Sequence, residues 1–435
     1  MPKDLQAVVI ADDLTGAADT GVLFTALAAP VYLLPFEGLS SVRPRLAAAA
    51  SLSVDTATRA RSAAEASTRV QSTAGSLPRP HPQWIYKKID SCLRGNLGAE
   101  IDALLDTLGF AAALVAPALP VQGRTTTGGI HKVHGTPLAQ TRFARDPITP
   151  VTGSRVAEIL ARQSRHRIGE IPLAAYGDPG RLQSTMQREC TRGRRLIVCD
   201  AVEPGHLDQV AALVVRSSEP LLPVGSSGLA ASLVNRLTGG RRTEPAPTPG
   251  LERLLMVCGT GVPVTHAQIS ALLDRYPGIR HELTPEWLIR ASAQDRRRRA
   301  DRLCAAWSDG ILALGIRPLP PAGPAVNPKQ AAIGLATLAD LAVQILWTSP
   351  VEGLFLSGGE TAAAFQHASD GEAIRLEREL LPGLVLGRWI GGLADGLPVI
   401  TKAGAFGEEQ TLVALYEYLL VKRVGSGSKP LMHQL

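Results

Sequence analysis

The stretch VVIADDLTGAADTGVLF (Val8–Phe24) sets the fold class. Its first residues are apolar and mostly β-branched, which predicts a buried strand, and an alanine-rich helix follows a short Leu-Thr-Gly turn. Two adjacent carboxylates, Asp12 and Asp13, stand where the strand ends, and a third acid, Asp19, lies in the helix. Because carboxylates at the end of a core strand are costly unless they are paired or used, this turn is a candidate binding site.

The same alternation of strands and helices continues along most of the chain. Expected strands lie at 7–11, 51–54, 84–89, 112–118, 195–201, 254–260, 310–316 and 384–390, and inside 353–365 and 398–407. Expected helices lie near 17–28, 60–75, 98–108, 205–216 and 327–346, with a last one ending near 421. This rhythm predicts an α/β protein of two α/β domains, with mainly parallel sheets facing a central cleft. Ligands of such sheets bind beyond the carboxyl ends of the strands, so we expect the active site in that cleft.

A break in the pattern marks the domain boundary. The segment RLTGGRRTEPAPTPGLER (236–253) is rich in glycine, proline and charge, which is typical of a linker. A chain of 435 residues also exceeds what one hydrophobic core usually supports. We therefore expect a first domain at 1–236, a linker at 237–250, a second domain at 251–424 and a loose tail at 425–435.

Composition narrows the function classes. The formal net charge is +6, but the one dense basic cluster, QDRRRRAD (294–301), has a helical pattern and no interleaved aromatic residues, so it indicates a solvated helix face rather than a nucleic-acid arm. The five cysteines include no C-x-x-C pair, which argues against a disulfide framework or a zinc site. With neither a standard signal peptide nor an apolar stretch of about 18 residues, we expect a cytoplasmic protein without membrane or nucleic-acid partners.

Three glycine-rich turns in the second half each follow an expected strand. They are Gly259-Thr260-Gly261, Ser357-Gly358-Gly359-Glu360-Thr361 and Lys402-Ala403-Gly404-Ala405-Phe406-Gly407. Glycine lets backbone N–H groups approach an anion, a helix N-terminus adds partial positive charge, and Lys402 could add a full charge. One such turn is often only a tight connection, but three at one sheet edge predict a nucleotide-phosphate site. Neither a P-loop nor a strand leading into G-x-G-x-x-G with a later acid occurs, so a nucleotide is favoured over a nicotinamide.

The first half carries a different set of polar residues. YKKIDSCLRGN (86–96) gathers charge and amide groups at a strand end, where Lys87, Lys88, Asp90, Ser91, Arg94 and Asn96 predict a site for a small polar anion; the alternative is a solvated loop. VDTATR (54–59) ends another strand with Arg59, whose planar fork suits a carboxylate. His131 and His134 are expected on one face of a hairpin strand, in a structural rather than a metal-binding role.

A nucleotide site in one domain and an acid-binding site in the other is the arrangement that a kinase needs. Phosphoryl transfer requires positioning, charge neutralisation and a base near the accepting hydroxyl. Asp12 and Asp13 could hold or deprotonate that hydroxyl, and Asp90 is the competing catalytic residue. A haloacid-dehalogenase-type phosphatase is disfavoured, because its strand ends in D-x-D-x-[TV] whereas this strand ends in D-D-L-T.

Eight ordered motifs, which cover nearly the whole chain, resemble the four-carbon acid sugar kinase family. They are IADDLTGAADTG, KKIDSCLRGN, PALPVQGRTTTGGIHKVHGTPL, ARDPITPV, PVGSSGLA, GTGVPVTHAQI, LSGGETA and TKAGAFG. The resemblance implies ATP-dependent phosphorylation of the terminal hydroxyl of a four-carbon sugar acid, with Mg²⁺ bridging the phosphates. Two of the motifs look more like the D-threonate or D-erythronate branch than the 3-oxo-tetronate branch, which stays the alternative. A non-catalytic sugar-acid sensor is the alternative from another class.

The resemblance also implies roles for individual residues. Asp12, Arg59, Lys87, Lys88 and Asp90 would contact the sugar acid, and we add Asp13 and Arg94 from their position in the same motifs. Thr260, Ser357, Gly358, Gly359, Glu360 and Gly404 would line the nucleotide. Cys92 stands where the family usually has threonine, and Thr260 replaces a serine but keeps the hydroxyl. A homodimer is compatible with the resemblance, although a single sequence indicates no interface.

Overall fold

The computed structural model describes residues 5–27, 30–37, 51–146, 148–241, 250–317, 327–404 and 406–421. The chain divides into two compact units. Unit 1 comprises Met1–Thr243 together with Glu372–Arg378, and unit 2 comprises Glu244–Gly371 and Glu379–Leu435. The short second segment of unit 1 lies inside the stretch that the sequence placed in the second domain. The tail expected at 425–435 and most of the expected linker fall outside the described residues.

Unit 1 is built on a parallel sheet. Its strands are β1 (Ala7–Ala11), β2 (Val31–Pro35), β3 (Ser51–Asp55), β4 (Trp84–Lys88), β5 (Ala112–Ala116), β9 (Arg167–Ile171), β10 (Arg194–Cys199) and β11 (Leu221–Gly225). They lie in the order β2-β3-β1-β4-β11-β5-β10-β9, and every neighbouring pair is parallel. Residues 374–376, in the first part of β16 (Ala373–Leu381), pair antiparallel with β2. The expected α/β class with mainly parallel sheets is confirmed.

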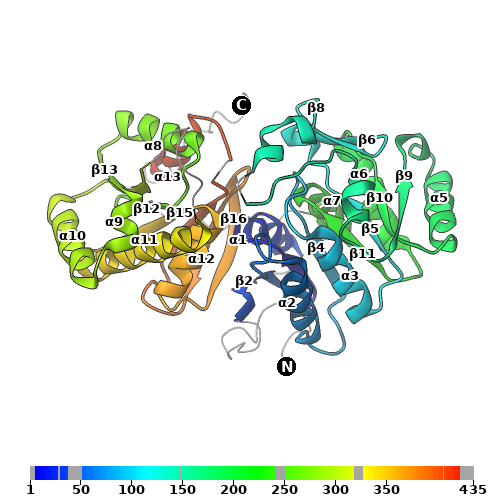
Figure 1. The fold of residues 1–435 in the computed structure, drawn as a ribbon, viewed down its shortest axis with the longest axis horizontal. Coiled ribbons are helices and arrows are strands. Elements are labelled where there is room, and N and C mark those ends of the chain that lie inside the picture. Colours follow the sequence, from blue (N-terminus) through cyan, green and yellow to red (C-terminus); the bar gives the residue numbers. More distant parts are fainter. Residues whose placement is uncertain are drawn as a thin grey trace. The chain divides into compact units, whose positions relative to one another are not determined.

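In the described part of unit 1, seven α-helices accompany these strands (Figure 1). They are α1 (Leu14–Gly21), α2 (Ala63–Gly75), α3 (Leu97–Leu108), α4 (Val156–Ala161), α5 (Pro179–Thr191), α6 (Pro204–Arg216) and α7 (Ser227–Thr238). Neighbouring residues of β4 show how the helices cover the sheet: Lys87 faces Glu100 of α3, whereas Lys88 faces Asp19 of α1. Because successive side chains of a strand point to opposite faces, α1 and α3 lie on opposite faces of the sheet.

A small antiparallel sheet belongs to the same unit. It consists of β6 (Arg124–Thr127), β7 (Ile130–Val133) and β8 (Thr136–Pro137), in the order β6-β7-β8. The hairpin expected around the histidines is therefore present, but His134 lies beyond β7 with φ 47°. The expectation that both histidines lie on one strand face is wrong. Side chains three residues apart in a strand point to opposite faces, and the chain leaves the strand before His134. Short 3₁₀ helices lie at Val22–Ala26, Pro120–Gln122, Leu138–Gln140, Arg142–Arg145 and Leu173–Ala175.

Unit 2 repeats the α/β principle with its own core. Its strands are β12 (Leu254–Cys258), β13 (Gly278–Leu283), β14 (Ile311–Ile316), β15 (Gly353–Ser357), β17 (Leu384–Ile390) and β18 (Pro398–Lys402), and its helices are α8 (Pro263–Arg275), α9 (Pro285–Arg290), α10 (Ala293–Ala306), α11 (Pro328–Thr348), α12 (Gly359–Ala368) and α13 (Thr411–Val421). The strand order is β13-β14-β12-β15-β18-β17, parallel except for the antiparallel pair β18–β17. The strands β12, β15 and β18 are buried along their full length, as expected for strands covered on both faces.

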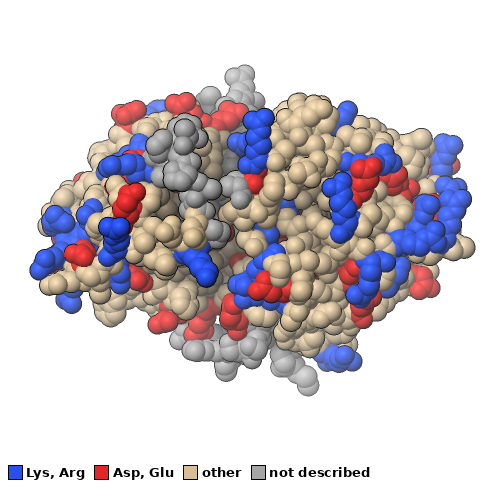
Figure 2. Space-filling model, viewed as in Figure 1, with Lys and Arg blue, Asp and Glu red and all other residues tan. Residues whose placement is uncertain are grey.

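Three features concern the nucleic-acid and membrane partners that the sequence argues against. The arginine cluster lies on α10, which begins with a capping box between Ser292 and Asp295 and buries Ala300 and Leu303. On the face shown in Figure 2, basic and acidic side chains alternate over each unit. In the described part of the chain, one helix, Lys329–Thr348 within α11, is long and apolar enough to cross a membrane. A single such helix is weak evidence for a membrane span, and this one packs against α9, α10 and α12.

Candidate functional site

The first candidate site lies at the carboxyl edge of the sheet of unit 1, where β1 and β3 end. The Arg59 guanidinium donates from Nε to Asp12 Oδ2 (2.8 Å) and from Nη2 to Asp12 Oδ1 (3.0 Å). Its Nη2 also donates to Asp13 Oδ1 (2.7 Å). Asp13 caps the first turn of α1, because its Oδ1 accepts from the Gly16 N–H (3.0 Å). The planar fork of Arg59 therefore binds carboxylates of its own chain, and its Nη1 group is the part left for other partners.

A second group of charges continues from this one. Asp90 Oδ1 lies 4.0 Å from Arg59 Nη2, and Asp90 accepts from Arg94 Nε (2.8 Å) and Arg94 Nη2 (3.1 Å). Arg94 Nη1 then reaches Asp146 Oδ2 (3.3 Å) in the ARDPITPV motif. Asp146 in turn accepts the backbone N–H groups of Ile148 (3.1 Å) and Thr149 (2.9 Å). These contacts join three sequence motifs, far apart along the chain, into one chain of alternating charges.

This acid–arginine network shifts the acidity of its carboxyl groups. Burial alone would raise the pKa of Asp12, but the Arg59 guanidinium holds it below its ordinary value. The same balance of burial against Arg94 and Arg59 places the pKa of Asp90 far below its ordinary value. Asp90 Oδ2 also accepts the N–H groups of Cys92 (3.2 Å) and Arg94 (3.3 Å). A carboxylate offers about four acceptor positions, so Asp12 keeps more capacity for a ligand hydroxyl than Asp90 does.

Asp55 is a site residue that the sequence did not single out, although the quoted segment VDTATR contains it. It ends β3 beside β1, is 4% exposed, and accepts the Ala57 N–H at 2.8 Å. Burial raises its pKa to about 7, and the charges of Asp13 and Asp12 act in the same direction. The sequence could have indicated Asp55, because it directly follows the expected strand 51–54 and parallel strands bring their carboxyl ends together.

The two predicted lysines have partners within the chain. Lys87 is fully buried, and its Nζ lies 2.7 Å from Glu100 Oε2 and donates to the carbonyl oxygens of Lys88 (2.8 Å) and Ile10 (3.4 Å). These three contacts use the three donors of the ammonium group. Lys88 Nζ lies 3.9 Å from Asp19 Oδ1 on the other face of the sheet. Lys87 thus ties the ends of β1 and β4 together from inside the core, which the sequence could not reveal.

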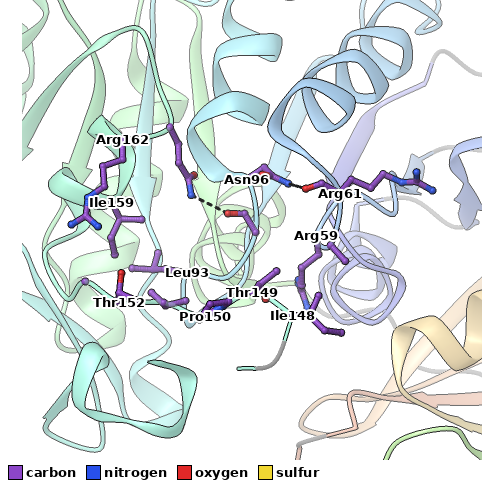
Figure 3. Close-up of a pocket in the computed structure, with 15 residues that line it drawn as sticks. Arg59, Arg61, Leu93, Asn96, Ile148, Thr149, Pro150, Thr152, Ile159 and Arg162 are labelled. Atoms are coloured by element: carbon purple, nitrogen blue, oxygen red, sulfur yellow. Dashed lines mark hydrogen bonds between the residues drawn. The ribbon is translucent and has the colours of Figure 1, made fainter. Parts of the chain in front are cut away.

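A cavity of about 300 Å³ adjoins the acid–arginine network (Figure 3). Its lining comes from the Arg59 loop, the Leu93–Asn96 turn, residues 148–153 and the end of α4, including Arg59, Arg61, Leu93, Asn96, Thr149, Thr152, Ile159, Arg162 and Gln163. Gln163 fixes two of these walls, because it accepts the Gly98 N–H (3.0 Å) and donates to the Gly95 carbonyl (3.1 Å). A cavity of this size with polar walls fits a small hydroxylated ligand.

The second candidate site lies at the carboxyl edge of the sheet of unit 2. The strand ends Cys258, Ser357 and Lys402 lie side by side, because Cys258 pairs with Ser357 and Ser357 with Lys402. The three glycine-rich turns therefore meet at one edge. Thr265 of α8 fastens the third turn by donating to the Gly404 carbonyl (2.6 Å).

The glycines of these turns are held where a side chain would not fit. A Cβ on Gly404 would lie 3.0 Å from Thr260 Oγ1, and one on Gly259 would lie 2.5 Å from Thr361 Oγ1. Gly358 has φ 100°, a conformation that favours glycine, and directly precedes α12. Glu360 lies in the first turn of that helix. The Gly358 N–H already donates to the Lys402 carbonyl (2.8 Å), so the anion-binding feature of this edge is the N-terminus of α12, whose partial positive charge suits nucleotide phosphates.

Ser357 and Lys402 differ in what they offer to a ligand. The Ser357 hydroxyl is buried and has no hydrogen-bond partner in the described part of the chain. The Lys402 ammonium instead donates to the carbonyl oxygens of Ala403 (3.0 Å), Gly404 (3.2 Å) and Phe406 (3.0 Å). Burial lowers its pKa to about 8. The sequence analysis expected Lys402 to offer its charge to a phosphate. In the structure its ammonium group instead binds the carbonyl groups of its own turn.

Two further residues that the sequence analysis named, His131 and Cys92, are buried next to the first site. His131 is buried, with Nδ1 2.9 Å from Thr126 Oγ1 and Nε2 2.8 Å from the Ser91 carbonyl, and burial lowers its pKa to about 4. It therefore links the small sheet to the Asp90 turn. Cys92 is buried as well, and burial raises the pKa of its thiol to about 11. Among the described residues, no group of three or more His, Cys, Asp or Glu side chains is placed to hold a metal ion.

Comparisons with known proteins cover both units. Residues 7–233 match the family model of a sugar-binding N-terminal domain, and residues 255–412 match that of a nucleotide-binding C-terminal domain. A D-erythronate kinase of Heliobacterium modesticaldum is 33% identical, over 95% of this chain and 97% of the relative. A D-threonate kinase of Salmonella typhimurium is 33% identical, over 95% of this chain and 98% of the relative. Curated relatives also include 3-oxo-tetronate kinases.

The fold is shared with solved proteins. A Salmonella typhimurium protein of known structure superposes with a TM-score of 0.77 at 23% identity, covering 96% of this chain and 98% of that chain. At this identity the likeness concerns the fold alone.

Proposed function

The chain belongs to the four-carbon acid sugar kinase family, and from this premise we propose that it transfers the terminal phosphoryl group of ATP to the 4-hydroxyl of D-threonate or D-erythronate. The observation that carries the proposal is the likeness to kinases of these two acids over nearly the full length of both proteins. The geometry supports it: unit 1 offers hydroxyl acceptors beside a small cavity, and unit 2 offers a glycine-lined anion site.

In this proposal, unit 1 holds the sugar acid. Asp12 and Asp13 accept hydrogen bonds from its hydroxyl groups, while Arg59 orients both carboxylates. Asp12 orients the accepting hydroxyl rather than acting as a strong base, because Arg59 lowers its pKa and phosphoryl transfer depends mainly on positioning and charge stabilisation. Asp90 is the second candidate for this role. Asp90 holds the Leu93–Asn96 turn, which forms one cavity wall, by accepting the backbone N–H groups of Leu93 and Arg94, and Lys87 acts from the core by fixing the strand ends.

Unit 2 holds the nucleotide. Thr260, Ser357, Gly358, Gly359, Glu360 and Gly404 line the phosphates, and the buried Ser357 hydroxyl supplies a donor for a phosphate oxygen. ATP supplies the phosphoryl group, and Mg²⁺ accompanying it neutralises phosphate charge. The proposed compartment is the cytoplasm, and the proposed partners are these small molecules and, at most, a second copy of the chain.

A coupled ADP-release assay tests the proposal, with ATP and Mg²⁺ against D-threonate, D-erythronate, L-threonate and 3-oxo-tetronate. We expect turnover with D-threonate or D-erythronate and a much lower kcat/KM with L-threonate. Preference for 3-oxo-tetronate would favour the alternative that some curated relatives suggest. Binding of an acid without ADP release in any reaction would refute the kinase and favour a sensor.

A further inference from the structure

The cations first expected to bind the substrate carboxylate already face carboxylates of the chain. Arg59 binds Asp12 and Asp13, and Arg94 binds Asp90 and Asp146. The remaining two are paired as well, since Lys87 contacts Glu100 and Lys88 faces Asp19. A substrate carboxylate placed at these residues would compete with existing ion pairs.

The charge balance at this edge points the same way. The acid–arginine network contains four carboxylates and two guanidinium groups, a formal net charge of −2 when all are ionised. The two lysine pairs add no net charge. A further carboxylate would therefore be repelled, whereas hydroxyl groups would find many acceptors. The hydroxyl end of a sugar acid suits the network, and its carboxylate needs a cation in the adjoining cavity, whose lining shares Arg59 with the network.

The cavity lining contains one such cation. Of its three arginines, Arg59 belongs to the network, and Arg61 donates from Nε to the Ala57 carbonyl (3.0 Å) and lies 3.8 Å from Glu65. The Arg162 guanidinium has no hydrogen bond or ion pair with any side chain or carbonyl of the described residues. In Figure 3, Arg61 points away from the other lining side chains, whereas Arg162 lies beside Ile159, across the lining from Arg59.

Arg162 can stay without a partner in the chain because its side chain is exposed, so that water hydrates the charge. It is the C-cap residue of α4, where the helix dipole favours a positive charge. It also lies next to Gly153, since a Cβ added there would come within 3.4 Å of Arg162 Nη2. The guanidinium therefore lies close to the 148–153 wall, and its charge forms part of the cavity lining. A planar guanidinium binds a carboxylate through two parallel hydrogen bonds.

We propose that Arg162 binds the C1 carboxylate of the sugar acid, with the hydroxyl end directed at the Asp12–Arg59 side of the cavity. This orientation rests on the proposed function and deepens it, because it assigns opposite ends of one substrate to opposite sides of one cavity. It also accounts for selectivity: a four-carbon sugar alcohol would fit the hydroxyl acceptors but would leave Arg162 without its partner.

The test compares Arg162→Gln, Arg162→Lys and a matched control, Arg145→Gln, which removes the same charge from an exposed position outside the cavity lining. We expect Arg162→Gln to raise KM for the acid about tenfold to a hundredfold, as for a lost charge-assisted hydrogen bond, with kcat changed less. Arg162→Lys should recover part of the loss, and Arg145→Gln should stay near wild type. Inhibition by the matching sugar alcohol should not weaken in Arg162→Gln.

The outcomes separate the two proposals. If the wild-type chain releases no ADP with any four-carbon acid, the proposed function fails, and the orientation fails with it. If the wild type is active but Arg162→Gln keeps its KM for the acid within about twofold, the kinase stands and the carboxylate assignment is overturned. An equal rise in KM for Arg145→Gln would also overturn it, because the effect would then be general charge rather than a contact.

Discussion

The buried Lys87–Glu100 pair provides a prediction that separates a structural role from substrate contact. Lys87 Nζ and Glu100 Oε2 are 2.7 Å apart, and the two side chains are 0% and 1% exposed. Burial raises the pKa of Glu100 above its ordinary value even with this partner, so the Glu100 carboxylate depends on Lys87 to stay charged. Removing one partner of a buried pair typically costs about 3–5 kcal/mol, because the other charge stays uncompensated.

We therefore expect Lys87→Met and Glu100→Leu each to destabilise unit 1 by about 3–5 kcal/mol. For a domain of this size, the midpoint of thermal unfolding should fall by about 6–20 °C. The double variant should recover most of the loss, since an apolar pair can replace a buried ion pair at little cost. Thermal unfolding of the full chain followed by circular dichroism measures this. The exposed pair Arg275–Glu417 offers a control, where Glu417→Gln should cost less than about 1 kcal/mol.

The double variant also decides what Lys87 does. If Lys87 only fixes the ends of β1 and β4, the double variant, with its apolar pair in place of the ion pair, should have a KM for the sugar acid within a few-fold of the wild-type value. A stable double variant with a strongly raised KM would show that Lys87 contacts the substrate, as the family resemblance implies. Single variants that lose less than about 1 kcal/mol, or a double variant that loses their sum, would refute the burial argument.

Three further predictions follow from the same geometry. Asp12→Asn should lower kcat about 100-fold or more in the ADP-release assay, because the accepting hydroxyl loses its charged acceptor; an unchanged kcat would move the role to Asp90. Gly404→Ala should raise KM for ATP about tenfold and leave KM for the acid unchanged, since the new Cβ would lie 3.0 Å from Thr260 Oγ1; equal ATP kinetics would contradict the phosphate site. For Asp55, burial raises the folded-state pKa from 3.8 to about 7, so the folded state binds the extra proton and stability falls as pH rises through that window. Asp55→Asn should flatten this dependence by up to about 4 kcal/mol between acid and neutral pH in urea unfolding, and parallel curves for the two proteins would show that Asp55 does not titrate there.

The sequence anticipates those parts of the fold that local pattern controls. The strand expected at 7–11 is β1, Ala7–Ala11, and the long helix expected near 327–346 is α11, Pro328–Thr348. By contrast, β16 was not expected, because AIRLERELL (373–381) mixes charged and apolar residues as a half-exposed antiparallel strand does. Its first part joins unit 1 through pairing with β2, a long-range contact that no local pattern encodes.

The candidate site shows the same division. Asp12, Arg59 and Asp90 were expected at strand ends, and they do meet at one edge. The sequence could not indicate which charged residues form ion pairs. Glu100, the partner of Lys87, lies in the first turn of α3, where an acidic residue is common in any helix. Likewise, Lys402 looked like a phosphate ligand because it follows a strand and precedes glycine, yet its ammonium group faces three carbonyls.

The most direct test of the central claim is the ³¹P NMR spectrum of the product formed from ATP, Mg²⁺ and D-threonate or D-erythronate. The account predicts a new phosphomonoester signal split into a triplet, because a phosphate on the terminal carbon couples to two protons. A doublet would place the phosphate on a secondary hydroxyl and contradict the assigned acceptor. Formation of inorganic phosphate alone would contradict the kinase itself.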